Sequence, residues 1–263
     1  MKYFTQPPIG SQLELSHSLN HGLVCYLPCH EKSGVIAQDL SIYKNRGIFY
    51  NVVPSSTSGW TGGKFGSSIS FDGTNDYVEA IHSSSLSLTS KGTLAAWINI
   101  RNIITFCQII GKRSAGSAAG LSYIIDLSSS GDKIRGLISN GSTINIITSS
   151  TAMLTNKWYF IVFTWNGSSL NVFLNGIKDA TSVSQTVNAQ VNSGHQLGIG
   201  IAADSSPLYF NGLMSELRVY NRALSEVEIS QLYYDPFCMF ENKNISRYLN
   251  EWYRKGSFFF SRL

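Results

Sequence analysis

The sequence predicts an all-β domain built as a two-sheet antiparallel sandwich. Only 14% of the 263 residues are charged, and glycine, serine, threonine and asparagine are abundant, which is typical of many short strands joined by tight turns. Asparagine–glycine pairs favour such turns, because both residues tolerate the positive φ angle that hairpins require. These pairs are Asn140-Gly141, Asn166-Gly167, Asn175-Gly176 and Asn211-Gly212. A chain of this length can bury one large core.

Segments rich in β-branched and aromatic residues, or alternating between apolar and polar, predict the strands. They lie at residues 122–127, 144–148, 159–164, 170–174 and 214–220. Ser225 then predicts a helix N-cap, with Glu228 in capping-box spacing, so residues 225–233 are expected to form one short helix. The core is expected to include Trp97, Phe160, Val162, Phe173 and Leu217.

The closing strand and helix resemble a known family. Residues 210–229 are similar, without gaps, to the closing segment of laminin-G-like domains of the concanavalin A superfamily. Further segments look like other strands and loops of that family, at residues 22–28, 39–47, 69–78, 92–98 and 157–176. The resemblance implies a concanavalin A-like jelly-roll sandwich over residues 21–235. We expect an N-terminal extension at residues 1–20 and an aromatic tail at residues 236–263.

Charge and hydropathy argue against two classes of partner. The formal net charge is only +4, and no cluster of lysine and arginine is interleaved with aromatic residues as in a nucleic-acid groove. No apolar run is long enough to span a bilayer, and residues 1–8 contain no targeting segment. We therefore expect neither nucleic-acid nor membrane binding.

An enzyme of this fold would need a pair of carboxylates. Sandwich glycoside hydrolases place two acidic residues on one strand face, and no such acidic motif occurs here. Glu226 and Glu228 are close in sequence, but they lie two apart on the predicted helix and so face different ways. We expect a protein without catalytic residues, and a glycoside hydrolase is the third and weakest alternative.

Ligand binding is expected at an exposed aromatic residue. Trp60 lies in a glycine-rich loop at residues 58–63, where its ring would offer a stacking face for a sugar. Arg113 and Ser114, in the loop at residues 111–120, would add polar contacts. The alternative is that Trp60 covers an open end of the core, since tryptophan buries a large area.

A calcium ion is expected from the family resemblance. Laminin-G-like relatives hold Ca²⁺ between an acidic loop and the acidic residue of the closing strand, which correspond here to Asp39 and Glu216, with Asn45 as a further oxygen ligand. In the alternative, Asp39 caps its own turn and Glu216 pairs with Arg218 or Arg222.

The C-terminal tail is expected to form an interface. Residues 245–253 place apolar side chains along one helical face, and three phenylalanines follow. The expected contact residues are Tyr248, Leu249, Trp252, Tyr253, Phe258 and Phe259.

Both chain ends look like those of phage-encoded proteins, so we expect a binding or structural protein on a virion surface. Its partners would be other virion or surface proteins, a glycan, or further copies of itself. The alternative is an extracellular, Ca²⁺-dependent carbohydrate-binding module.

Overall fold

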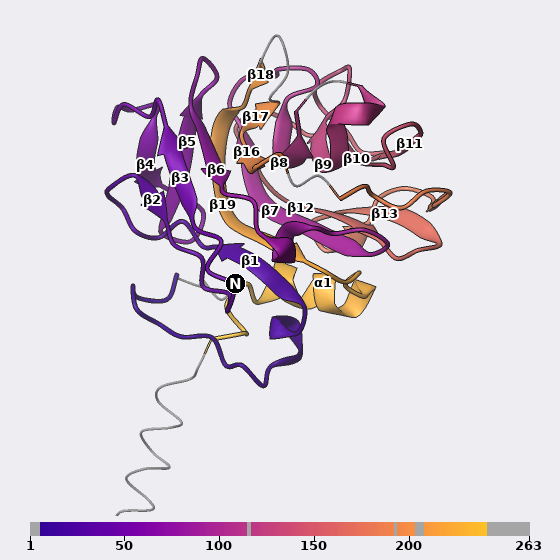
Figure 1. Cartoon of the computed structure of the whole chain (residues 1–263). Coiled ribbons are helices and arrows are strands. Elements are labelled where there is room, and N and C mark those ends of the chain that lie inside the picture. The colour runs from indigo at the N-terminus through magenta and orange to yellow at the C-terminus, as the bar shows by residue number, and fades with distance from the viewer. Residues whose placement is uncertain (1–5, 115–116, 192–193, 203–207, 241–263) are drawn as a thin grey trace, which may run out of the picture.

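Two large antiparallel sheets pack face to face in the computed structural model, which describes residues 6–114, 117–191, 194–202 and 208–240 (Figure 1). One α-helix lies in the described part of the chain, after the last strand. The predicted all-β sandwich with a short C-terminal helix is confirmed. None of the helices in these ranges has the length and apolar character needed to cross a membrane.

The first sheet has nine strands, in the order β14-β13-β12-β7-β19-β5-β4, with β1 also paired to β19 and β15 to β13. Its strands are β1 (Leu23–Leu27), β4 (Gly59–Gly62), β5 (Ser67–Asp72), β7 (Gly92–Ile100), β12 (Trp158–Trp165), β13 (Ser169–Leu174), β14 (Ile177–Lys178), β15 (Val183–Ser184) and β19 (Asn211–Tyr220). The pairing of β19 with β7 shifts register between Ser215 and Arg218, and Glu216 there has a φ of 55°. This bulge turns Glu216 out of the regular ladder.

The second sheet has eight strands, in the order β11-β10-β9-β8-β16-β6-β3-β2. Its strands are β2 (Ile36–Ala37), β3 (Gly47–Tyr50), β6 (Tyr77–Ala80), β8 (Gln108–Arg113), β9 (Leu121–Leu127), β10 (Ile134–Ser139), β11 (Ile144–Thr148) and β16 (Leu197–Ile199). β17 (Ile201–Ala202) and β18 (Leu208–Tyr209) form a separate pair. The 3-10 helices are η1 (Ser18–Asn20), η2 (Ser84–Leu86) and η3 (Ala118–Gly120).

The main core fills the space between the sheets. Phe163 and Trp165 of β12 are fully buried in it. Gly136 on β10 faces this layer, because a Cβ atom there would lie 2.0 Å from the Phe163 ring. The two sheets therefore approach closely where an aromatic side chain of one meets a glycine of the other.

A second core covers the outer face of the nine-stranded sheet. Trp97 and Phe160 lie on this face, and α1 (Glu226–Tyr234) packs over them, with the Tyr233 ring stacked on Trp97 at 5.5 Å. The five predicted core residues are all buried, as predicted. Only Leu217 lies between the sheets, whereas the other four lie in this second core.

Both ends of the described chain belong to the second core. Leu13 forms an isolated β-bridge with Phe240, and Leu19 and Met239 are fully buried. The sandwich therefore extends beyond the expected boundaries at residues 21 and 235. Residues 241–263, with the expected interface residues Tyr248, Leu249, Trp252, Tyr253, Phe258 and Phe259, lie outside the described residues.

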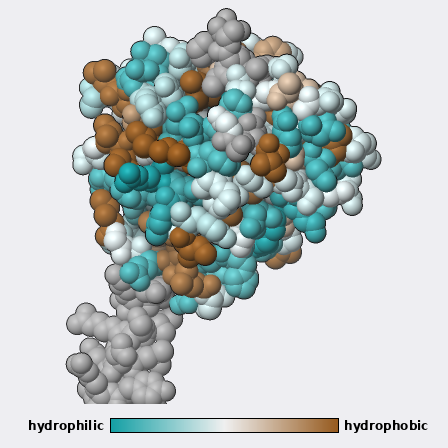
Figure 2. All heavy atoms as spheres, viewed as in Figure 1, coloured by the Kyte–Doolittle hydropathy of each residue, from teal (hydrophilic) through white to brown (hydrophobic). Residues whose placement is uncertain are grey.

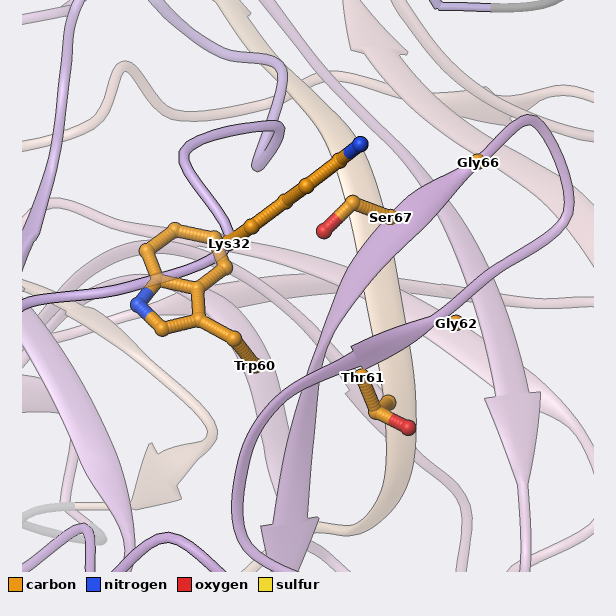
Figure 3. Close-up of a pocket in the computed structure, with 6 residues that line it drawn as sticks. All are labelled: Lys32, Trp60, Thr61, Gly62, Gly66 and Ser67. Atoms are coloured by element: carbon orange, nitrogen blue, oxygen red, sulfur yellow. The ribbon is translucent and has the colours of Figure 1, made fainter.

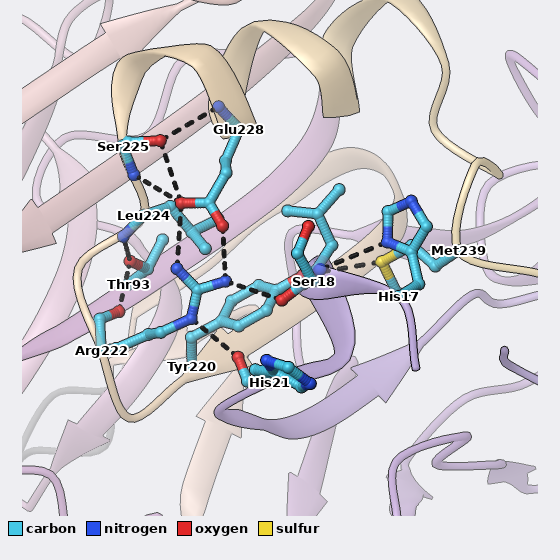
Figure 4. Close-up of polar contacts among 11 residues, drawn as sticks. His17, Ser18, His21, Thr93, Tyr220, Arg222, Leu224, Ser225, Glu228 and Met239 are labelled. Carbon is cyan, nitrogen blue, oxygen red and sulfur yellow. Dashed lines mark hydrogen bonds and ion pairs between the residues drawn. The ribbon is translucent and has the colours of Figure 1, made fainter. Parts of the chain in front are cut away.

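The N-terminus of α1 is capped as predicted. Ser225 and Glu228 form a capping box, in which Oγ of Ser225 accepts from the Glu228 amide and the Glu228 carboxylate accepts from the Ser225 amide (Figure 4). The same carboxylate binds both terminal nitrogens of Arg222, at 2.6 and 2.9 Å. Arg222 also donates to the carbonyl oxygens of Ser18 and His21. This cluster thus ties the helix to the N-terminal segment.

The asparagine–glycine pairs behave in two ways. Asn166-Gly167 joins β12 to β13, and Asn175-Gly176 joins β13 to β14 with φ angles of 53° and 81°. Asn140-Gly141 lies between β10 and β11, so three of the four predicted turns are confirmed. The turn predicted at Asn211-Gly212 is wrong, because both residues lie within β19. A Cβ atom on Gly212 would lie 2.1 Å from the Asn99 carbonyl oxygen, so the close approach of β7 requires the glycine.

Candidate functional site

A pocket of about 210 Å³ opens at the edge strand β4 of the nine-stranded sheet. It is lined by Lys32, Trp60, Thr61, Gly62, Gly66 and Ser67 (Figure 3). β4, the β4–β5 turn and the start of β5 supply five of these residues, and the loop before β2 supplies Lys32. The pocket thus combines an aromatic ring, two hydroxyl groups and one positive charge.

Trp60 both covers the core and forms a wall of the pocket. Its indole packs on Phe49 with ring centroids 5.0 Å apart, and its Nε1–H donates to the Gly34 carbonyl oxygen at 2.8 Å. The residue is half-buried and contacts the main core. The sequence left open whether Trp60 is a ligand-binding ring or a cover over the core. In the structure one side of the side chain packs on the core and another lines the pocket. Such fixed aromatic rings are typical of carbohydrate-binding surfaces.

Lys32 supplies the charge of the pocket. Figure 3 shows its side chain beside the Trp60 ring and the Ser67 hydroxyl. Within the described ranges its ammonium group has no hydrogen bond or ion pair, and the residue is exposed. Lys32 is absent from the residues predicted from the sequence. Its loop meets β4 only in the folded chain, so no local pattern marks it.

Gln6 holds the end of the β4–β5 turn in place by binding Ser67, which lines the pocket. Its Oε1 accepts from the Ser67 amide at 2.7 Å, and its Nε2 donates to the Pro28 carbonyl oxygen at 2.8 Å. Nε2 also lies 3.2 Å from Oε1 of Glu216. The N-terminal segment therefore fixes the two chain segments that form the pocket.

Arg113 and Ser114 lie away from this pocket. Arg113 ends β8 in the eight-stranded sheet, and the Ser114 amide donates to the Gly120 carbonyl oxygen at 2.9 Å. β8 lies inside its sheet, whereas β4 is an edge strand of the other sheet (Figure 1). Neither residue lines the pocket. The structure therefore does not join them to Trp60 in one site.

Asp39 organises its own loop. Its carboxylate accepts hydrogen bonds from the amides of Tyr26, Ser41 and Asn45 and from the Ser41 hydroxyl, at 2.6–2.8 Å. The Asn45 side chain donates to the Val24 carbonyl oxygen and accepts from a nearby serine hydroxyl. These bonds match the alternative in which Asp39 caps its own turn.

Glu216 lies in a separate buried network. Its Oε2 accepts from the Tyr26 hydroxyl at 2.5 Å and from Arg218 at 2.9 Å. Arg218 also donates to the Pro236 carbonyl oxygen at 2.7 Å, and its guanidinium stacks on the Tyr26 ring at 4.1 Å. Burial raises the pKa of the Glu216 carboxyl, while Arg218 and Tyr26 oppose the rise. This ion pair matches the alternative to calcium binding stated for Glu216, in which it pairs with Arg218 or Arg222.

The structure does not bring Asp39 and Glu216 together. They are bound by opposite ends of Tyr26, the amide and the hydroxyl. Among the described residues, no group of three or more histidine, cysteine, aspartate or glutamate side chains could hold a metal ion. The geometry favours structural roles for both carboxylates, and calcium binding by Asp39, Asn45 and Glu216 stays a prediction.

Solved structures share this fold at low sequence identity. Domain 4 of AbnA, a GH43 extracellular arabinanase from Geobacillus stearothermophilus solved with arabinotriose, has a TM-score of 0.61 and 13% identity, covering 80% of this chain and 98% of that domain. The binding domain of Paraclostridial Mosquitocidal Protein 1 has a TM-score of 0.64 and 17% identity, covering 84% of this chain and 54% of that one.

A third similar structure is the ligand-binding domain of botulinum neurotoxin serotype D in complex with N-acetylneuraminic acid. It has a TM-score of 0.59 and 14% identity, and the match covers 83% of this chain and 52% of that chain. The present chain thus spans about half the length of the two toxin chains. At these identities the likeness shows the fold alone.

No curated protein sequence matches the chain. A family description does match, for the concanavalin A-like lectin/glucanases superfamily, over residues 72–230. The matched segment is more than half of the chain and runs from the last residue of β5 into α1. The chain therefore belongs to the concanavalin A-like lectin/glucanase superfamily.

Proposed function

We propose that this protein is a non-enzymatic glycan-binding protein and that the Trp60 pocket is its binding site. The observation that carries the proposal is that the Trp60 ring and the unpaired Lys32 ammonium line one pocket, beside a Ser67 hydroxyl that is buried and has no hydrogen-bond partner among the described residues. An aromatic ring binds the apolar face of a sugar, and hydroxyl and ammonium groups bind its oxygen atoms.

The charge of the pocket favours an acidic glycan. Lys32 is the only charged residue among the six that line it, and no carboxylate neutralises it within the described ranges. A carboxylate on the sugar would form a charge-assisted hydrogen bond with this ammonium. The similar toxin domain in complex with N-acetylneuraminic acid and the arabinanase domain in complex with arabinotriose support glycan binding on this fold.

The lining also favours binding over hydrolysis. Glycoside hydrolysis requires two carboxylates that flank the scissile bond, and the six lining residues include neither aspartate nor glutamate. Sialidase and arabinanase chains are among the similar structures, so the fold by itself does not decide this point.

Two variants test the site on an array of sialylated and uncharged glycans. Lys32→Gln removes the positive charge from an exposed side chain and should weaken binding to sialylated glycans about tenfold, or about 1.4 kcal/mol. Trp60→Ala should weaken binding to every glycan that the pocket holds. Lys157→Gln, an exposed lysine that does not line the pocket, is the matched control. Unchanged sialylated-glycan binding by both pocket variants would refute the proposal.

A location on the surface of a particle such as a virion, with residues 241–263 as the attachment segment, is a further part of the proposal. The resemblance of the chain ends to phage-encoded proteins motivates it. Electron microscopy of the source particle with an antibody against the sandwich would test it, and absence of label from intact particles would contradict it.

A further inference from the structure

A row of tyrosines lies on the outer face of the eight-stranded sheet. Phe49 of β3 and Val78 of β6 are register partners and belong to the main core. Because side chains alternate along a strand, the next pair, Tyr50 and Tyr77, points away from the core. β3 and β6 run next to each other on the left of the view in Figure 1. Figure 2 shows hydrophobic and hydrophilic residues interspersed on the left of the same view.

The tyrosine rings pack against one another. Tyr50 and Tyr77 lie 4.9 Å apart, centroid to centroid, with only 7° between their planes. Tyr209 of β18 continues the row at 6.2 Å from Tyr77. Tyr50 is 38% exposed, and the other two are half-buried. Within the described part of the chain, none of the three hydroxyl groups has a hydrogen-bond partner.

Glu79 lies on the same face, two residues after Tyr77 on β6. Its register partners are Ile48 of β3 and Gly198 of β16, which provide neither a cation nor a hydrogen-bond donor side chain. The carboxylate has no hydrogen bond or ion pair among the described residues, and the residue is half-buried. Burial accordingly raises the pKa of Glu79. A partly desolvated carboxylate without a donor is costly unless a ligand supplies one.

We propose that Tyr50, Tyr77 and Glu79 form a second saccharide-binding surface, which takes an uncharged oligosaccharide lying across β3 and β6. The exposed parts of the rings offer apolar contact to a sugar, and the unpaired hydroxyls offer polar contact. The carboxylate accepts hydrogen bonds from sugar hydroxyls and repels a carboxylate or sulfate. The charge preference is therefore opposite to that of the Trp60 pocket, and this inference stands independently of that site.

The test is isothermal titration calorimetry with three uncharged probes: arabinotriose, cellotetraose and maltotetraose. The full chain should bind at least one of them. Tyr50→Ala and Glu79→Gln should each weaken that binding at least about tenfold. Tyr234→Ala removes a tyrosine that is 69% exposed on α1 and should leave binding unchanged. Melting temperatures of the variants show whether each remains folded.

The outcomes separate the two sites. Loss of binding in the Tyr50 and Glu79 variants, with binding retained in Trp60→Ala, supports the second surface. Loss only in Trp60→Ala overturns it and places the uncharged sugar in the pocket. If none of the three probes binds, the inference is also overturned. The proposed function is tested separately, because binding of sialylated glycans to the Trp60 pocket is measured on the glycan array. A spermidine titration gives one more outcome: binding of this amine without any sugar would overturn the saccharide assignment, because Glu79 would then select cations.

Discussion

Replacing Arg218 by methionine should unfold the protein more easily and in a pH-dependent way. Arg218 and Glu216 are both fully buried, and their ion pair is 2.9 Å long. Methionine retains much of the length of the side chain but leaves the Glu216 carboxylate without its cation. The Tyr26 hydroxyl and the Pro236 carbonyl oxygen also lose a donor. This change isolates the charge pair from the packing around it.

The magnitude follows from breaking one half of a buried pair, which costs about 3–5 kcal/mol. For a chain of this length, that corresponds to a fall in melting temperature of about 5–9 °C.

The loss of stability should also depend on pH. Arg218 opposes the rise that burial causes in the pKa of Glu216, so its removal should raise that pKa further. The folded variant then binds a proton more readily than the unfolded chain. Its stability should therefore increase as pH falls from neutral toward the unfolded carboxyl pKa of about 4.3.

Urea unfolding followed by tryptophan fluorescence, at about pH 5 and about pH 8, measures both effects, since the pH dependence of the loss reports the proton linkage. Adding Glu216→Gln to the methionine variant is the control, because a neutral amide removes the unpaired charge. The double variant should recover part of the free energy of unfolding at the higher pH. Its loss of stability should then be the same at both pH values. A single variant that loses less than about 1 kcal/mol at the higher pH, or the same amount at both pH values, would refute the reasoning.

Three further predictions concern the helix, the metal and the tail. Ser225→Ala should cost about 1 kcal/mol in the free energy of unfolding, because it removes the N-cap acceptor; an unchanged urea midpoint would argue against the cap. Chelation by EDTA should leave the melting temperature unchanged if Asp39 and Glu216 have only the structural roles that their hydrogen bonds indicate, whereas a fall that added Ca²⁺ reverses would support the calcium site. Deleting residues 241–263 should leave a folded sandwich and abolish assembly or docking, and an unfolded truncation would contradict the attachment role.

The strands and the helix could be predicted because their signals are local. Alternation identifies β19, and two residues three apart identify the N-cap of α1. Asn211-Gly212 shows where a local signal misleads. The pair is typical of a turn, yet the glycine is needed because the backbone of β7 comes within contact distance. Sequence alone gives no indication of a neighbouring backbone.

The second core could not be predicted, because its parts are far apart in the sequence. Leu13 and Phe240 are bridge partners separated by most of the chain, and each looks like part of a terminal extension when considered alone. The same limit applies to the Trp60 pocket. Tryptophan in a glycine-rich loop identifies one wall, whereas Lys32 enters the pocket only because its loop packs beside β4.

Strand β3 contributes to both proposed binding surfaces. Phe49 and Tyr50 follow each other on β3, and they point to opposite faces of the sheet because side chains alternate along a strand. Phe49 packs under the Trp60 ring at 5.0 Å, while Tyr50 stacks on Tyr77 at 4.9 Å. Adjacent residues thus support two surfaces of opposite charge, a lysine pocket and a glutamate face. Variants at Trp60 and at Tyr50 should therefore test the two proposed sites separately, each weakening binding at one surface only.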